Sequence, residues 1–138
     1  MIASQKIDIL YVDDEPPLLD VTKLYLERTG QFTVDTAESA SIALQKLETT
    51  SYDAVVSDYQ MPGMDGIQFL TKLREKFPHL PFLIFTGRGR EEVAIQAFEC
   101  GADFYLQKGG DPRSQFTEMA HKIRSAVQYR KEHKALQE

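Results

Sequence analysis

The chain has one cysteine, no tryptophan and no long hydrophobic run. Because Cys100 has no second cysteine to pair with, no disulfide forms within the chain and nothing points to an oxidising compartment. The longest apolar runs are short, such as residues 82–85, whereas a membrane span needs roughly 18 residues. Residues 1–6 also lack the charged-then-apolar order of a secretory signal. We therefore expect a cytoplasmic protein without membrane insertion.

Basic residues are few and dispersed. The chain holds 16 Lys and Arg against 21 Asp and Glu, a net charge of −5. Residues 113–138 alone are mildly basic, with six basic residues against three acidic ones. A nucleic-acid-binding domain needs a concentrated cationic face. We therefore expect no direct contact with nucleic acid, and we interpret the basic segment as a solvated helix.

The 138 residues, of which 42% are hydrophobic and 27% charged, fit a single globular domain. Short apolar runs alternate five times with amphipathic segments, a pattern typical of a parallel sheet covered by helices on both faces. An all-helical bundle is disfavoured, because it would have to absorb these apolar runs between helix breakers. The predicted strands are residues 7–12, 32–36, 53–57, 82–86 and 104–107.

Polar side chains follow four of the predicted strands. Asp13 and Asp14 follow the first strand and Asp58 follows the third, while Thr86 ends the fourth and Lys108 follows the fifth. In an open doubly wound sheet, ligands bind outside the carboxyl ends of the strands. Carboxylates crowded there repel one another unless a cation intervenes, and oxygen ligands suit a hard divalent ion such as Mg²⁺. A hydrogen-bonded acidic turn is the alternative interpretation.

The order and spacing of these motifs resemble the receiver domain of two-component response regulators, over residues 6–128. The resemblance is carried by Leu10-Tyr11-Val12-Asp13-Asp14-Glu15, by Asp58 with Met61-Pro62 and Met64-Asp65-Gly66, by Phe85-Thr86-Gly87, and by Tyr105-Leu106-Gln107-Lys108. It implies a flavodoxin-like three-layer α/β sandwich, with a five-stranded parallel sheet in the order 2-1-3-4-5 and five helices. Residues 129–138 are then a helical C-terminal extension or linker.

The resemblance also implies the chemistry of the site. Asp58 is the phosphoacceptor, which receives a phosphoryl group from a phosphohistidine on a sensor histidine kinase or a phosphotransfer protein. Asp14, Asp58 and the backbone carbonyl of Gln60 ligate Mg²⁺, with Mn²⁺ or Ca²⁺ as substitutes, and Asp13 acts through a bound water. Lys108 pairs first with Asp58 and then with a phosphoryl oxygen.

Further residues are expected to transmit and time the signal. The resemblance implies that Thr86 and Tyr105 switch the face formed by the fourth helix, the fifth strand and the fifth helix. Gln60 and Arg88 flank the path of the attacking water and tune the phosphoryl lifetime. The domain assists only its own phosphorylation and dephosphorylation and is not otherwise an enzyme. Its signal then goes to a downstream effector or to additional domains of a longer chain.

The residue after Lys108 departs from the family pattern, which commonly has a proline with a cis bond there. This chain has Gly109 followed by Gly110. A cis bond before a non-proline residue costs about 3 kcal/mol, so we expect the 108–109 bond to be trans. The stretch Lys-Gly-Gly-Asp-Pro is similar to receivers found in archaeal multidomain sensor kinases.

Three other functions compete with the phosphoacceptor assignment. An aspartate-nucleophile phosphatase needs a second Asp two residues after the nucleophile, where this chain has Gln60. A flavin or nucleotide binder of the same fold needs a Gly-rich phosphate cradle after the first strand, where this chain has acidic residues. A receiver-like interaction module that is never phosphorylated stays open as the third.

Overall fold

Strands and helices alternate along the chain, as the apolar pattern predicts. The structure, a computed structural model, describes residues 6–87 and 91–137. The strands are β1 (Ile7–Val12), β2 (Phe32–Ala37), β3 (Ala54–Ser57), β4 (Phe82–Thr86) and β5 (Phe104–Gln107). The helices are α1 (Pro16–Arg28), α2 (Ala40–Thr49), α3 (Gly66–Lys76), α4 (Glu91–Glu99) and α5 (Pro112–Gln137).

The five strands form one parallel sheet in the order β2-β1-β3-β4-β5, which confirms the predicted flavodoxin-like fold. Two strand ends differ by one residue from the prediction. β2 continues to Ala37, because that residue still pairs with Val12 of β1. β3 begins only at Ala54, and the Asp53 side chain instead accepts a hydrogen bond from the Asp8 backbone N–H at 2.7 Å.

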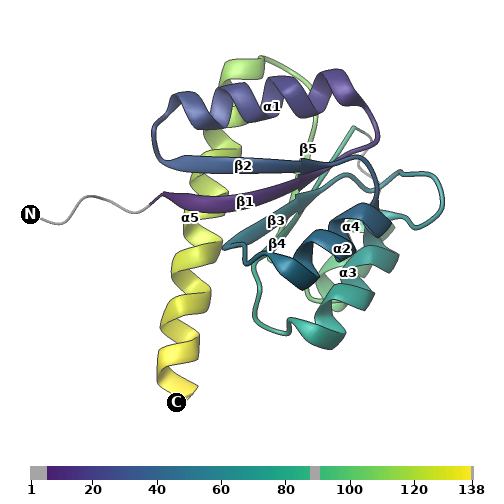
Figure 1. Ribbon diagram of the computed structural model, residues 1–138, viewed down its shortest axis with the longest axis vertical. Helices are drawn as coiled ribbons and strands as arrows, with labels where there is room; N and C mark the ends of the chain where they lie inside the picture. The colour runs from purple at the N-terminus through teal and green to yellow at the C-terminus, as the bar shows by residue number, and fades with distance from the viewer. Residues whose placement is uncertain (1–5, 88–90, 138) are drawn as a thin grey trace, which may run out of the picture.

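Helices cover both faces of the sheet, and the sheet separates the two layers of the core (Figure 1). One layer lies under α1 and α5 and includes Ile9 and Tyr11 of β1. The other lies under α2, α3 and α4 and includes Leu10 and Val12. Because successive side chains of a strand point to opposite faces, the last four residues of β1 are buried on both sides of the sheet, and they are continuously apolar rather than alternating.

Local signals define where the helices begin. Pro16 opens α1 at a position whose missing N–H has no partner in a helix. Ser39 caps α2, and Asp65 forms a reciprocal capping box with Gln68 at the start of α3. The Asp111 carboxylate accepts a hydrogen bond from the Ser114 backbone N–H at the start of α5.

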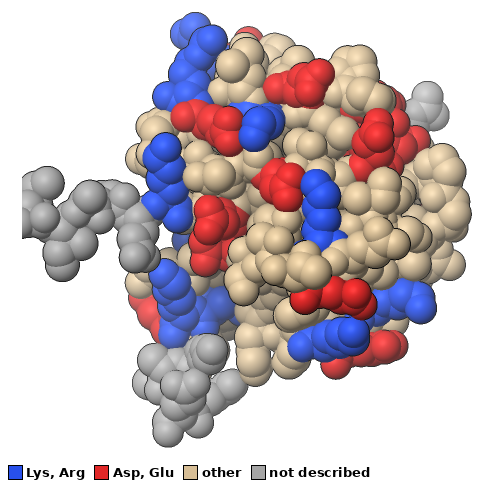
Figure 2. All heavy atoms as spheres, viewed as in Figure 1, with Lys and Arg blue, Asp and Glu red and all other residues tan. Residues whose placement is uncertain are grey.

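The last helix is 26 residues long and runs past the body of the domain to the C-terminus (Figure 1). It continues without a break through residue 129, where the sequence suggested an extension. Basic and acidic side chains are interspersed on the face that Figure 2 shows. Among the described residues, none of the helices is both long enough and apolar enough to cross a membrane.

Candidate functional site

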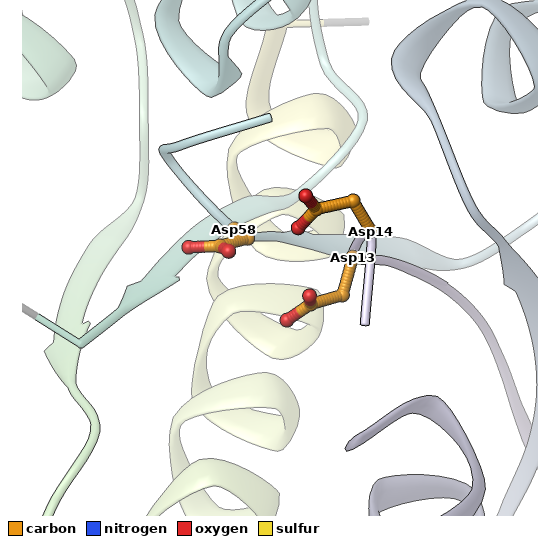
Figure 3. Close-up of side chains that lie close together, drawn as sticks. All are labelled: Asp13, Asp14 and Asp58. Carbon is orange, nitrogen blue, oxygen red and sulfur yellow. The ribbon is translucent and has the colours of Figure 1, made fainter. Parts of the chain in front are cut away.

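Three carboxylates meet at the carboxyl edge of the sheet, as the sequence predicted. Asp13, Asp14 and Asp58 each offer an oxygen, and these oxygens all lie within 4.8 Å of one another (Figure 3). The register of the sheet brings them together, because Val12 of β1 pairs with Ser57 of β3 and an aspartate follows each. The Asp58 backbone N–H donates to the Val12 carbonyl at 2.9 Å, which fixes the two loops side by side.

The three aspartates differ in exposure. Asp13 is completely buried and Asp58 is only 6% exposed, whereas Asp14 is exposed at the rim. The cluster is therefore closed by the protein core on the Asp13 side and open to solvent on the Asp14 side. This arrangement leaves room for a ligand that approaches from solvent and contacts both Asp14 and Asp58.

Asp13 is held by three donors. Its Oδ1 accepts the Glu15 backbone N–H at 3.0 Å. Its Oδ2 accepts both the Tyr11 hydroxyl at 3.4 Å and the Lys108 ammonium at 2.9 Å. A carboxylate has about four lone-pair positions, so one remains for a further donor such as a metal-bound water.

Lys108 connects the end of β5 to the acidic cluster. Its Nζ lies 2.9 Å from Asp13 Oδ2 and 3.5 Å from Asp58 Oδ2, so it pairs with both carboxylates and more closely with Asp13. The ammonium lies 5.5 Å from the centroid of the Phe85 ring. Its backbone N–H donates to the Thr86 carbonyl at 2.8 Å, so the pairing of β4 with β5 positions the lysine.

The positive charge of Lys108 does not balance the negative charge of the three aspartates. Burial raises the pKa of the Asp58 carboxyl above its ordinary value, and the Asp13 charge raises it further. The Lys108 ammonium and the Tyr59 backbone N–H act in the opposite direction but do not cancel the rise in pKa. Burial and Asp13 also raise the pKa of the Tyr11 hydroxyl, which is therefore a protonated donor. The chemistry of this donor set fits a hard divalent cation, because such an ion stabilises the ionised carboxylates.

The loop from Asp58 to Gly66 forms the open side of the site. A Cβ on Gly66 would lie 2.5 Å from the Asp58 carbonyl oxygen, so only glycine fits at this start of α3. Its N–H donates to the Tyr59 carbonyl at 2.7 Å. A pocket of about 390 Å³ opens here, lined by Asp14, Tyr59, Gln60, Met61, Pro62 and Asp65. Gln60 and Asp14 thus line the same pocket.

The predicted switch residues lie at the ends of β4 and β5. Thr86 is 2% exposed and pairs with Gln107, while Tyr105 is half-buried and packs against the layer under α2, α3 and α4. The predicted lifetime residue Arg88 lies outside the described residues.

The bond between Lys108 and Gly109 is trans, as predicted, since no peptide bond in residues 6–87 and 91–137 is cis. Gly109 and Gly110 take φ values of 129° and 76°, which favour glycine. The Gln115 side-chain amide donates to the Gly109 carbonyl at 2.6 Å and to the Gln107 carbonyl at 3.2 Å. The loop after the lysine is therefore held by α5 without a proline.

Two residues of the site were not predicted to take part. Tyr11 contacts Asp13 through its hydroxyl, and the Ser57 hydroxyl donates to the Asp58 carbonyl at 2.9 Å. A signal for Tyr11 was available, because residues two apart in a strand point to the same face. Tyr11 and Asp13 have that spacing, so a hydroxyl directed toward the acidic edge could have been anticipated.

Known proteins match this chain in sequence and in fold. The family model of the response regulator receiver domain matches residues 9–120. This chain belongs to the response regulator receiver family. The receiver is 40% identical over 111 residues to the response regulator Rre1 of Synechocystis, which covers 79% of this chain and 48% of that protein. It is 34% identical over 128 residues to the transcriptional regulatory protein ResD of Bacillus subtilis, covering 93% of this chain and 52% of ResD.

A solved structure gives the same result in three dimensions. A response regulator receiver domain protein from Clostridium thermocellum superposes on this receiver with a TM-score of 0.81 and 32% identity, over 91% of this chain and 97% of that one. By contrast, the receiver spans about half the length of the two curated relatives. The chain is thus a signalling domain of two-component systems, and its match to those relatives is confined to one part of them.

Proposed function

We propose that this receiver accepts a phosphoryl group on Asp58 from a phosphohistidine of a sensor histidine kinase or a phosphotransfer protein. The observation that carries the proposal is the cluster of Asp13, Asp14 and Asp58 within 4.8 Å, with Lys108 paired to two of them. Phosphoryl transfer depends mostly on positioning and on electrostatic stabilisation, and this cluster offers both.

The cation of the proposed reaction is Mg²⁺, for which Mn²⁺ or Ca²⁺ could substitute. Asp14, Asp58 and the Gln60 carbonyl would hold it from the open side, and Asp13 would act through a bound water at its remaining lone pair. When bound, the ion neutralises charge on the carboxylates and on the phosphoryl oxygens. The raised pKa of Asp58 supports this assignment, since the buried carboxylate lacks sufficient positive charge.

The chain's own residues supply the remaining chemistry. An Asp58 carboxylate oxygen attacks phosphorus, the new P–O bond forms, and the P–N bond to the donor histidine breaks. The Lys108 ammonium turns from the carboxylates to a phosphoryl oxygen. Its Nζ already lies 3.5 Å from Asp58, so only a side-chain rotation is needed. Gln60 and Arg88 would tune how readily water later attacks the phosphoryl group.

The proposed signal leaves the site through Thr86 and Tyr105. The Thr86 hydroxyl would bond a phosphoryl oxygen and draw the loop after β4 inward, and the Tyr105 ring would then rotate inward. This repacks the face formed by α4, β5 and α5, which shifts a pre-existing two-state equilibrium. Residues 6–128 would act as the receiver and residues 129–138 as a helical linker, toward a downstream effector or further domains. In this proposal the domain is cytoplasmic and catalyses no reaction on other molecules.

Incubation with acetyl phosphate and Mg²⁺, followed by intact mass measurement, tests the proposal. An adduct of about 80 Da should form on the wild type and be lost when a chelator removes the metal. It should be absent from Asp58→Asn and present in Asp20→Asn, a control at an exposed aspartate of α1. Turnover of a phosphate ester would favour the phosphatase, and failure of the wild type to form an adduct would favour the unphosphorylated module.

A further inference from the structure

Tyr11 places a buried hydroxyl directly beneath the acidic cluster. Its side chain has no exposed surface, and its hydroxyl donates to Asp13 Oδ2 at 3.4 Å. Asp13 is equally buried, so bulk water does not reach Oδ2 to replace a donor that this oxygen loses. Lys108 Nζ contacts the same oxygen at 2.9 Å. Asp13 Oδ2 thus accepts hydrogen bonds from both the Lys108 ammonium and the Tyr11 hydroxyl.

Packing does not require this hydroxyl. The Tyr11 ring lies in the apolar layer under α1 and α5, where a phenylalanine ring would fill the same space. A buried hydroxyl costs free energy unless it is hydrogen-bonded. The Thr22 hydroxyl of α1 is also buried and lies near enough to the Tyr11 hydroxyl to act on the pKa of Tyr11, although it makes no hydrogen bond of ordinary geometry among the described residues. The Asp13 carboxylate is therefore the acceptor that satisfies the buried Tyr11 hydroxyl.

We propose that Tyr11 is a positioning residue, whose hydroxyl keeps the Asp13 carboxylate hydrogen-bonded when Lys108 turns to the phosphoryl group. This inference rests on the proposed function, because it requires Lys108 to leave Asp13. Before transfer, Asp13 Oδ2 has two side-chain donors, and after transfer it has Tyr11 alone. Without the hydroxyl, this oxygen of a fully buried carboxylate would lose its last side-chain donor. Asp13 would then retain Lys108 and oppose the phosphorylated state.

The Tyr11→Phe variant isolates this contribution, since it removes the hydroxyl and keeps the ring. The lost hydrogen bond matters more after Lys108 has moved than before, so the variant should bind beryllofluoride, a phosphoryl mimic, about tenfold more weakly in the presence of Mg²⁺. Its affinity for Mg²⁺ alone should change less than about twofold, because Lys108 then still contacts Asp13.

The experiment measures Mg²⁺ affinity by calorimetry and beryllofluoride affinity by fluorine NMR. Tyr25→Phe is the matched control, because Tyr25 packs against the same layer and stacks on Phe116 at 4.9 Å without contacting the site. It should leave both affinities unchanged. Urea unfolding verifies that each variant is folded. In a Lys108→Ala background, the further change Tyr11→Phe should alter beryllofluoride affinity less than about twofold, since no lysine then leaves Asp13.

The outcomes separate this inference from the proposed function. If the wild type binds beryllofluoride and Tyr11→Phe binds it equally well, Tyr11 has no such role and the proposed function stands. An equal loss of Mg²⁺ and beryllofluoride affinity would also overturn the inference, because it would indicate a general distortion of the site. If the wild type does not bind beryllofluoride at all, the proposed function fails and this inference fails with it.

Discussion

Replacing Asp58 with asparagine should stabilise the receiver when no divalent cation is present. The carboxylate is 6% exposed and lies beside Asp13 and Asp14, and within residues 6–87 and 91–137 Lys108 is the cation that pairs with it. Asparagine has nearly the same shape, and its Oδ1 can still accept the Tyr59 N–H that now donates to Asp58 at 2.7 Å. The substitution therefore removes a charge while it keeps the packing and one hydrogen bond.

The distances give the magnitude. Two unit charges 4.8 Å apart repel by about 3 kcal/mol at an effective dielectric constant of about 20. Asp58 has two such neighbours, against an attraction of about 5 kcal/mol to Lys108 at 3.5 Å. The two repulsions and the attraction nearly cancel, so the cost of burying the ionised carboxylate, which is the largest cause of its raised pKa, decides the sign, and Asp58→Asn should relieve about 2 kcal/mol. For a chain of this size that corresponds to a rise in melting temperature of about 7 °C.

Urea unfolding at neutral pH, followed by circular dichroism, measures this difference. Saturating Mg²⁺ should stabilise the wild type much more than Asp58→Asn, because Asp58 is one of the proposed ligands of the ion in the folded state and the variant lacks that carboxylate. The gap between the two proteins should therefore shrink or reverse. Asp20→Asn, at an exposed position of α1, serves as the control and should match the wild type with and without Mg²⁺.

The difference in stability between Asp58→Asn and the wild type should depend on pH. Folding raises the pKa of Asp58, so the folded state binds this proton more tightly than the unfolded state does. The destabilisation is therefore absent below the ordinary pKa of 3.8, and it develops as pH rises through the folded-state pKa. Relative to the wild type, Asp58→Asn should gain most free energy of unfolding at neutral pH and none at acid pH. A variant less stable than the wild type at neutral pH, or a gain that grows as pH falls, would refute the reasoning.

Three further substitutions test other parts of the structure. Gly66→Ala should lose about 1–3 kcal/mol in urea unfolding, because its Cβ would lie 2.5 Å from the Asp58 backbone carbonyl oxygen; unchanged stability would contradict this close approach. Arg130→Met should lose about 1–2 kcal/mol, because Arg130 Nε donates to Asp103 at 2.8 Å, whereas the exposed Arg113→Met should lose almost nothing. Thr86→Ala should still form the phosphoryl adduct but show weaker phosphorylation-dependent NMR shifts in α4 and β5; unaltered shifts would disprove the switch.

The sheet was predictable because its signal is local. Each buried strand is a short apolar run bounded by turn or helix-start residues, and the five runs identified every strand to within one residue. The predicted strand ends are wrong where pairing with the adjacent strand determines where a strand stops. Ala37 belongs to β2 because Val12 of β1 continues opposite it, and no property of residue 37 alone indicates this. The predicted fold then implied which strand ends meet, since topology alone brings Asp13 and Asp58 together.

The contacts within the site were less predictable, because they depend on which rotamers the core permits. The sequence placed Lys108 near Asp58, yet its closer partner is Asp13, which is the more deeply buried of the two carboxylates. The cluster of Arg74, Asp103 and Arg130 was not predicted at all. Its members lie 27 and 29 residues apart in sequence, on α3, before β5 and on α5. No local pattern links residues at such separations.

The two ends of β5 join the acidic site to the last helix. Lys108 directly follows this four-residue strand at the carboxyl edge, and Asp103 directly precedes it at the opposite edge. Asp103 is bound by Arg130 of α5 at 2.8 Å and also accepts the Phe82 backbone N–H at 2.8 Å. The same short strand therefore connects the acidic site, through Lys108 that follows it, with the anchor of α5, through Asp103 that precedes it.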